Sequence, residues 1–181
     1  SVSRKIIYDT FRMQYCFRAQ NSFADMRGGG DLALTSQFAL QIVVNPDYLG
    51  RSLSSEMVKA LIGIGREHNH QSLFAPVRPN HKHRYPLTPM ERYINWINSD
   101  SLPFDPWLRV HARLGAEIVR VCPEAMHIYG TVAEWEAWTD MRFPESDSYI
   151  VPGALAPVSI DVKADRGVYI EPNVWTHHRI S

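Results

Sequence analysis

The segment PWLRVHARLGAEIVRV, residues 106 to 121, contains a histidine that could transfer protons. His111 lies three residues after Leu108 and three before Leu114, so a helix over this segment places all three side chains on one face. An imidazole has an ordinary pKa of about 6.5, and burial favours its neutral form. His111 can therefore act as an acid, as a base, or as both through water. The alternative is a core histidine that bonds a backbone carbonyl.

A second candidate site follows an apolar strand predicted over residues 32–44. NPDYLG (45–50) breaks this strand, and a helix is predicted over 51–69 with Ser52 or Ser54 as its N-cap. Four apolar residues at helical spacing support this helix: Leu53, Met57, Leu61 and Ile64. A helix N-terminus reached from a strand exposes backbone N–H groups and the positive end of the helix dipole, which suits a pyrophosphate. An ordinary strand–helix junction has the same pattern.

The other elements predict one mixed α/β domain over residues 1–181. We expect a buried strand at 72–77, a helix near 88–100, a helix near 130–141, and two or three strands between 148 and 175. Thr88 and Glu91 have the spacing of a capping box. Residues 1–30 match no element that we can assign. Because the chain begins with Ser1, we expect native N-terminal sequence to be missing.

The composition limits the classes of function. The 181 residues are 45% hydrophobic and 21% charged, as in an ordinary soluble domain. Lys plus Arg and Asp plus Glu both number 19, and zero net charge argues against binding nucleic acid or membranes through positive charge. Neither a signal peptide nor a membrane-spanning apolar run is visible. Cys16 and Cys122 lie far apart, so we expect a reduced, cytoplasmic setting.

The histidine pairs at 68/70 and 81/83 have the spacing of metal ligands. Neither pair has a cysteine or an acidic cluster nearby, so we expect no metal. The basic loop RPNHKHR (78–84) is either a solvated surface or a phosphate contact.

The strand–turn–helix sequence VVNPDYLGRSLSSEMVKAL resembles the acyl-CoA-binding segment of the GNAT (Gcn5-related N-acetyltransferase) superfamily. Five residues fit that segment: Val44, Asn45, Pro46, Tyr48 and Gly50. Leu49 stands where the superfamily has a basic or amide residue, and Ser52 and Ser54 replace two small residues. Serines can still present backbone amides, though less closely than glycine.

HARLGAEIV resembles a second GNAT motif, in which an aromatic residue four positions before a glycine protonates the leaving CoA sulfur. His111 occupies that position before Gly115, and Glu117 to Val121 form the next strand. Phrases such as APVRP, PFDPWLRVH and GTVAEWE are similar to an actinobacterial-type GNAT subgroup. The resemblance covers about residues 38–178.

The resemblance implies a mixed, twisted β-sheet flanked by helices, in which strands 38–44 and 72–77 splay apart to admit a donor thioester. The donor would be acetyl-CoA or another acyl-CoA, or an acyl carrier protein, and the acceptor a small-molecule amine. His111 would be the general acid, and Gln41 would position a water or the acceptor. Backbone amides near Val43 and Val44 would polarise the thioester carbonyl.

The resemblance also implies the donor-binding residues. The loop and first helical turn would hold the pyrophosphate: Leu49, Gly50, Arg51, Ser52, Leu53, Ser54 and Ser55. Arg78 would bind the 3′-phosphate of CoA or the phosphopantetheine arm of a carrier protein.

Two alternatives stay open. GNAT-like loading domains decarboxylate malonyl-CoA and acylate a carrier protein, using a histidine at this helical position and a threonine on the strand after the CoA-binding helix. His111 matches, but the predicted strand SLFAPV offers Val77 where a hydroxyl is needed. The other alternative, indicated by Leu49 and Ser52, is a non-catalytic module that binds CoA or a partner.

Overall fold

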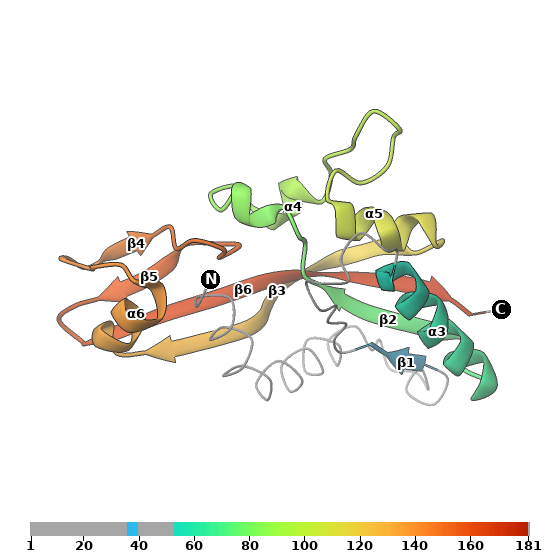
Figure 1. The fold of residues 1–181 in the computed structure, drawn as a ribbon, viewed down its shortest axis with the longest axis horizontal. Coiled ribbons are helices and arrows are strands. Elements are labelled where there is room, and N and C mark those ends of the chain that lie inside the picture. Colours follow the sequence, from blue (N-terminus) through green and yellow to red (C-terminus); the bar gives the residue numbers. More distant parts are fainter. Residues whose placement is uncertain (1–35, 40–52, 181) are drawn as a thin grey trace.

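The computed structural model describes residues 36–39 and 53–180, which form a mixed sheet flanked by helices (Figure 1). In chain order the elements are β1 (Ser36–Phe38), α3 (Leu53–Glu67), β2 (Ser72–Val77), α4 (Met90–Tyr93), α5 (Pro106–Arg113), β3 (Glu117–Gly130), α6 (Val132–Thr139), β4 (Asp147–Tyr149), β5 (Val158–Asp161) and β6 (Arg166–Arg179). The predicted α/β class is confirmed. None of the helices described is long and apolar enough to cross a membrane.

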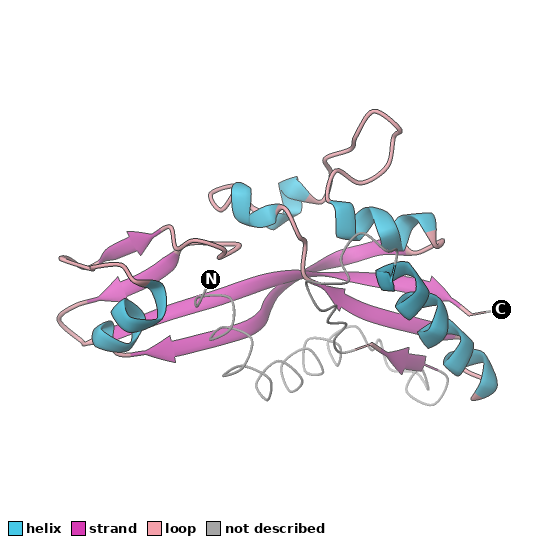
Figure 2. Ribbon diagram, viewed as in Figure 1, coloured by secondary structure: helices cyan, strands magenta, loops and turns pink. Residues whose placement is uncertain are grey.

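The sheet has the order β1-β2-β6-β5-β4, with β3 on the other edge of β6. β1 and β2 are parallel, as expected for strands joined by a connection that contains a helix, here α3. β6 is antiparallel to β2, β3 and β5. Figure 2 shows that β3 and β6 are the longest strands and run through both ends of the sheet.

One edge of β6 pairs with two different strands along its length. β2 pairs with residues 174–179 and β5 with residues 166–168. Within the described part of the chain, no strand pairs with residues 169–173 on that edge. Side chains connect this stretch to nearby loops instead: Glu171 binds Arg78, and the Tyr169 hydroxyl accepts a hydrogen bond from the backbone N–H of Leu155.

This change of partner divides the sheet into two halves. The β2 half consists of β1, β2 and the adjoining parts of β3 and β6, with α3, α4 and α5. The β5 half consists of β4, β5, α6 and the other ends of β3 and β6. Each half has its own apolar core. β3 has register shifts between Ile118 and Arg120 and between Cys122 and Met126. Such bulges bend and twist a strand, and the second one lies between the two cores.

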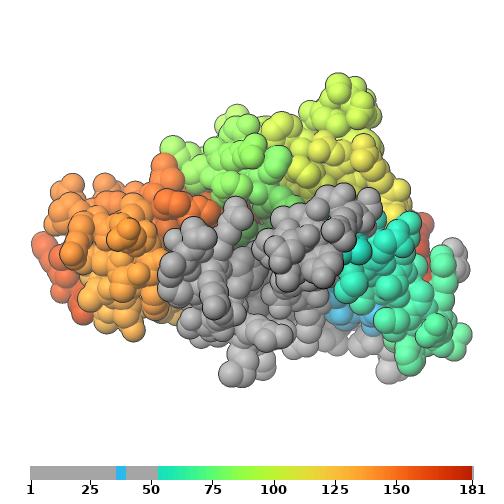
Figure 3. Space-filling model, in the orientation of Figure 1, coloured from blue at the N-terminus to red at the C-terminus, as the bar shows by residue number. Residues whose placement is uncertain are grey.

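Several predicted elements are confirmed. β2 has the predicted bounds, α3 and α6 lie within the predicted helices, and the C-terminal region contains three strands. β3 begins at the predicted residue but continues to Gly130. The apolar stripe that predicted α3 is not its buried face. Leu53, Met57 and Ile64 are 37–46% exposed, and the helix buries Val58 and Gly65 instead. Figure 3 shows α3, in teal, at the surface.

The capping box predicted at Thr88 and Glu91 is wrong. α4 is a single turn with Pro89 at its N-cap, and no side chain caps it. The Thr88 backbone N–H instead closes a turn onto the Tyr85 carbonyl. A capping box does form at α6, where Thr131 and Glu134 bond each other's backbone N–H groups.

Two tryptophans of α6 pack on glycines of the sheet. Gly130 and Gly167 are paired residues of β3 and β6. A Cβ atom on Gly130 would lie 2.7 Å from the Trp138 ring, and one on Gly167 would overlap the Trp135 ring. The absence of side chains at these positions therefore allows α6 to approach the sheet.

We predict that Gly167→Ala destabilises the protein by about 1–3 kcal/mol, the usual cost of overpacking a core. The free energy of unfolding from urea denaturation measures this. Gly63→Ala is the matched control, because no atom lies within 4 Å of its added Cβ and alanine favours the helix. Equal stability of the two variants would show that Trp135 relaxes without cost.

Candidate functional site

The helix that carries His111 is held at its N-terminus by a buried carboxylate. Asp105, 1% exposed, is the N-cap of α5, and its side chain accepts hydrogen bonds from the backbone N–H groups of Trp107 and Leu108. It also accepts from the backbone N–H groups of Asn80 and His81 and from the Tyr93 hydroxyl. Asp105 therefore joins α5 to the loop after β2 and to α4.

α5 begins at Pro106, the first residue of the predicted helical segment, and it buries the predicted face. The missing N–H of this proline costs nothing at the helix start, and the helix is followed by Gly115 with a φ of +82°. Leu108 and His111 are its buried residues, 1% and 2% exposed, and Leu114 is half-buried. The Trp107 ring packs edge-on against the His111 imidazole, with centroids 4.6 Å apart. The imidazole thus lies between the helix and the sheet.

Two β6 side chains meet His111 at the sheet. His111 Nδ1 lies 2.9 Å from Nε2 of His178, which is 1% exposed, and 3.4 Å from the Thr176 hydroxyl. Thr176 donates its proton to the Ala75 carbonyl of β2 at 3.2 Å. We call His111, Thr176 and His178 the histidine cluster. Nε2 of His111 has no hydrogen-bond partner in the described part of the chain.

The histidine cluster is uncharged at neutral pH. Burial, together with the neighbouring His178, lowers the pKa of His111 to about 3. Burial also lowers the pKa of His178, although the nearby backbone of Leu114 acts in the opposite direction. Nδ1 of His178 is a second buried ring nitrogen with no hydrogen-bond partner in the described residues. The expected neutral form of His111 agrees with this environment. A neutral imidazole that keeps one nitrogen unbonded can accept or donate a proton there.

Sequence reasoning did not identify the partners of His111. Thr176 and His178 lie 65 and 67 residues after His111 in the sequence, so no local pattern could reveal these contacts. The alternation in VWTHHR does place Thr176 and His178 on one face of a strand. Asp105 was also missed, although an aspartate directly before a proline at the first helical position is an N-cap signal.

Most of the predicted donor-binding loop lies outside the described residues. This applies to Gln41, Val43, Val44, Leu49, Gly50, Arg51 and Ser52. Leu53, Ser54 and Ser55 form the first turn of α3, where backbone N–H groups lack partners within the helix. Figure 1 shows this end of α3 near α5, and the two helices are in contact. β1 and β2 pair from Ser36–Ser72 to Phe38–Phe74, and the predicted splay beyond that involves residues 40–44, outside the described part.

Arg78 lies directly after β2 and is bound to protein groups. Its Nε lies 2.9 and 3.0 Å from the two Glu171 carboxylate oxygens, and Nη2 donates to the Gly153 carbonyl at 2.8 Å. Glu171 is 1% exposed, whereas a third of the Arg78 side chain is exposed. Tyr169 donates its hydroxyl proton to Glu171, and burial raises the pKa of this phenol.

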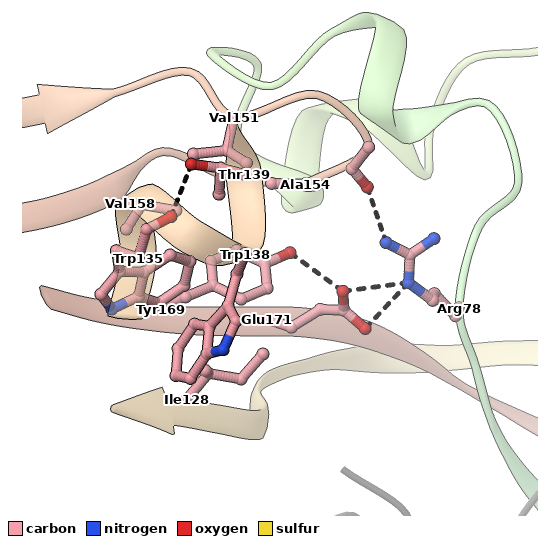
Figure 4. A pocket seen from close by; sticks show the side chains of 11 residues that line it. Arg78, Ile128, Trp135, Trp138, Thr139, Val151, Ala154, Val158, Tyr169 and Glu171 are labelled. Carbon is pink, nitrogen blue, oxygen red and sulfur yellow. Dashed lines mark hydrogen bonds and ion pairs between the residues drawn. The ribbon is translucent and has the colours of Figure 1, made fainter. Parts of the chain in front are cut away.

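A small pocket adjoins this ion pair in the β5 half (Figure 4). Its walls are largely aromatic and aliphatic, and they include Trp135, Trp138, Val151 and Ile128. Arg78 and Glu171 lie at one side of it. The pocket does not include His111: Glu171 and Thr176 are five residues apart on β6, or about 16 Å along an extended strand.

No group of three or more His, Cys, Asp or Glu side chains in the described ranges is placed to hold a metal ion. Cys122 is a buried cysteine that forms no disulfide within the described residues.

Comparison with known proteins finds similarity to a curated acetyltransferase and to a solved loading domain. No protein-family model matches the chain. Over 160 residues the chain is 30% identical to the arginine N-acetyltransferase avaD of Aspergillus versicolor, covering 78% of this chain and 55% of that protein. The chain thus spans about half the length of the curated relative it matches. The loading GNATL domain of CurA from Lyngbya majuscula aligns at a TM-score of 0.49 and 17% identity, covering 83% of this chain and 57% of that chain.

We predict that His111 makes the fold sensitive to acid. Its folded pKa of about 3 lies below its unfolded value of about 6.5, so its contribution is present above pH 6.5. As pH falls from 6.5 towards 3, the His111 imidazole binds a proton in the unfolded state but not in the folded state. This should cost up to about 2 kcal/mol between pH 7 and pH 5.

Urea denaturation at a series of pH values measures this loss. His111→Asn, which keeps an N–H at the Nδ1 position but does not titrate, should show a shallower decline below pH 6.5. His68→Asn, at an exposed histidine, should keep the wild-type slope. A parallel decline in all three proteins would contradict the burial of a neutral His111.

We predict that Asp105→Ala destabilises the protein by about 3 kcal/mol or more, because it leaves four backbone N–H groups and the Tyr93 hydroxyl without their acceptor. Thermal and urea unfolding measure the loss. Asp100→Ala, in the exposed loop before α5, should change stability by no more than about 0.5 kcal/mol. Similar values for both variants would show that Asp105 is not needed to hold α5.

Proposed function

We propose that the chain is a GNAT-type acyltransferase domain that moves an acyl group from a CoA or carrier-protein thioester to a small-molecule amine. One observation carries this proposal: a buried, neutral His111 has one ring nitrogen with no hydrogen-bond partner among the described residues, on a helix in contact with α3. The 30% identity to an acetyltransferase supports it. The separated cysteines, Cys16 and Cys122, and the soluble composition favour a cytoplasmic location.

The proposed reaction needs one proton removed and one delivered. The acceptor nitrogen attacks the thioester carbonyl carbon, and a C–N bond forms as the C–S bond breaks. The nitrogen loses a proton to His111 Nε2, and the departing thiolate takes up one proton, so atoms and charge balance. A histidine with its free nitrogen near both groups can serve each transfer in turn.

The donor would lie against the N-terminus of α3. The N–H groups of Leu53, Ser54 and Ser55, which have no partners within the helix, and the helix dipole suit a pyrophosphate. In this proposal Leu49 to Ser52 continue the cradle, Val43 and Val44 polarise the carbonyl, and Gln41 positions the acceptor. Arg78 would contact the 3′-phosphate from its exposed side while it keeps its ion pair with Glu171.

A second candidate function is decarboxylation of a malonyl-type thioester followed by acyl transfer to a carrier protein. One observation favours it. The strand β2 offers no hydroxyl at Val77, but Thr176 on the neighbouring strand β6 places one 3.4 Å from His111 Nδ1. This hydroxyl already bonds the Ala75 carbonyl, so amine acylation remains the first proposal.

We predict that His111→Ala lowers the rate of acyl transfer by roughly 10²–10⁴-fold, the usual value of a positioned acid or base. Free-thiol release from acetyl-CoA, with a panel of amines that includes arginine, measures the rate. Isothermal titration with acetyl-CoA should show little change in donor affinity, since the pyrophosphate contacts lie on α3 and its preceding loop.

His177→Gln is the control, because this neighbouring β6 histidine bonds Ser72 rather than His111. Full activity of His111→Ala together with reduced stability would make His111 a core residue and overturn its assignment. Carbon dioxide release from malonyl-CoA would favour the second candidate, and absence of acetyl-CoA binding would point to a carrier-protein donor or a non-catalytic module.

A further inference from the structure

Two neutral histidines share one hydrogen bond in the core. The 2.9 Å contact between His111 Nδ1 and His178 Nε2 requires a proton on one of these nitrogens and a lone pair on the other. The location of that proton decides what His111 offers at its unbonded Nε2. A proton on Nδ1 leaves Nε2 as an acceptor, whereas a proton on Nε2 makes it a donor.

Thr176 favours a proton on Nδ1 of His111. The threonine hydroxyl gives its own proton to the Ala75 carbonyl, so its oxygen presents lone pairs to the nitrogen 3.4 Å away. Nδ1 of His111 therefore faces one acceptor, the Thr176 oxygen, as well as a nitrogen of His178 that can take either role. An N–H at this position satisfies both, whereas a lone pair would face the oxygen without a proton between them.

The surroundings of His178 lead to the same assignment. Nδ1 of His178 has no hydrogen-bond partner in the described part of the chain, but the backbone of Leu114 raises the pKa of this ring, as an acceptor facing a ring N–H does. A neutral imidazole has one N–H, so the nitrogen that faces His111 is then an acceptor. Both arguments favour a hydrogen bond that His111 Nδ1 donates to His178 Nε2.

We propose that His178 is a positioning residue that holds the proton of His111 on Nδ1 and thereby keeps His111 Nε2 as an unprotonated base. The proposal rests on the proposed function and specifies it: His111 removes the proton from the acceptor nitrogen as the C–N bond forms. The resulting imidazolium donates to His178, which stabilises it. His111 thus begins the reaction as a base, before it can serve as the acid that the GNAT resemblance implied.

Few charged groups disturb this arrangement. β2 faces the cluster with Leu73 and Ala75, the residues paired with His178 and Thr176, and α5 faces it with Trp107. The titratable neighbours are the two histidines themselves and, for His178, also His177. Glu117 and Arg179, near the end of the sheet, act on His177.

Nitrogen-15 NMR of histidine-labelled protein tests the assignment directly, because protonated and unprotonated ring nitrogens have different shifts and couplings. At neutral pH the wild type should show His111 protonated at Nδ1 and bare at Nε2. A His111 ring protonated at Nε2 would overturn the proposal. The NMR measurement requires no substrate, so its result holds even if the wild type transfers no acyl group. Absence of acyl transfer would count against the proposed function alone.

Kinetics of three variants test the role. His178→Leu, which removes the acceptor, should lower kcat by roughly 10–100-fold, the usual loss when the partner that orients a functional histidine is removed, with KM for acetyl-CoA little changed. His178→Gln should retain most of kcat, since an amide oxygen can accept the Nδ1 proton. His177→Gln should match the wild type.

Thermal unfolding of each variant separates this effect from instability. Equal losses of kcat in His178→Leu and His178→Gln, in variants that remain folded, would overturn the positioning role, as would full kcat in His178→Leu. His111→Tyr gives a further readout. A phenol can donate a proton but is a poor base, so we expect this variant to be no more active than His111→Ala. Partial rescue by tyrosine would show that this position needs to supply only an acid, and it would overturn the proposed base role.

Discussion

The hydrogen bonds of the Asp105 carboxylate set the position of α5, and the geometry around His111 depends on that position. Five donors from three segments meet this one buried side chain: two N–H groups of the helix start, two from the loop after β2, and the Tyr93 hydroxyl. A helix of eight residues is too short to be stable alone. Tertiary contacts must hold it. The Asp105 carboxylate, which also binds the loop after β2, places the first turn of α5 beside the sheet.

From that anchored start, the helical repeat determines what reaches the sheet. Leu108 and His111 lie three residues apart, so they share the buried face of α5. Across this face, strand alternation on β6 presents Thr176 and His178 in the same direction. Helical spacing on α5 and strand alternation on β6 each point side chains toward the other element. Once the sheet register fixes the position of β6, side chains 65 or more residues apart in sequence can form hydrogen bonds.

Those periodicities explain what the sequence could predict. β2 and α5 were predicted with close bounds because an apolar run, an early proline and a glycine stop are local signals. The predicted capping box at Thr88 was wrong because the Thr88 backbone N–H bonds the Tyr85 carbonyl in a turn, and the helix that follows has only one turn. The partners of His111 depend on the β2–β6 register, which no local pattern of residues reveals. The exposed stripe of α3 shows that helical spacing identifies an apolar face without showing what covers it.

The late position of β6 in the chain has a consequence for how the molecule folds. This strand follows every other described element, yet it pairs with β2, β3 and β5. Its pairing with β2 closes loops of about a hundred residues, and high contact order of this kind slows folding because entropy is lost before contacts form. Until β6 docks, His111 has neither hydrogen-bond partner, and β2 has no antiparallel neighbour among the described strands. Assembly of the histidine cluster should therefore coincide with the rate-limiting closure of the sheet and not precede it.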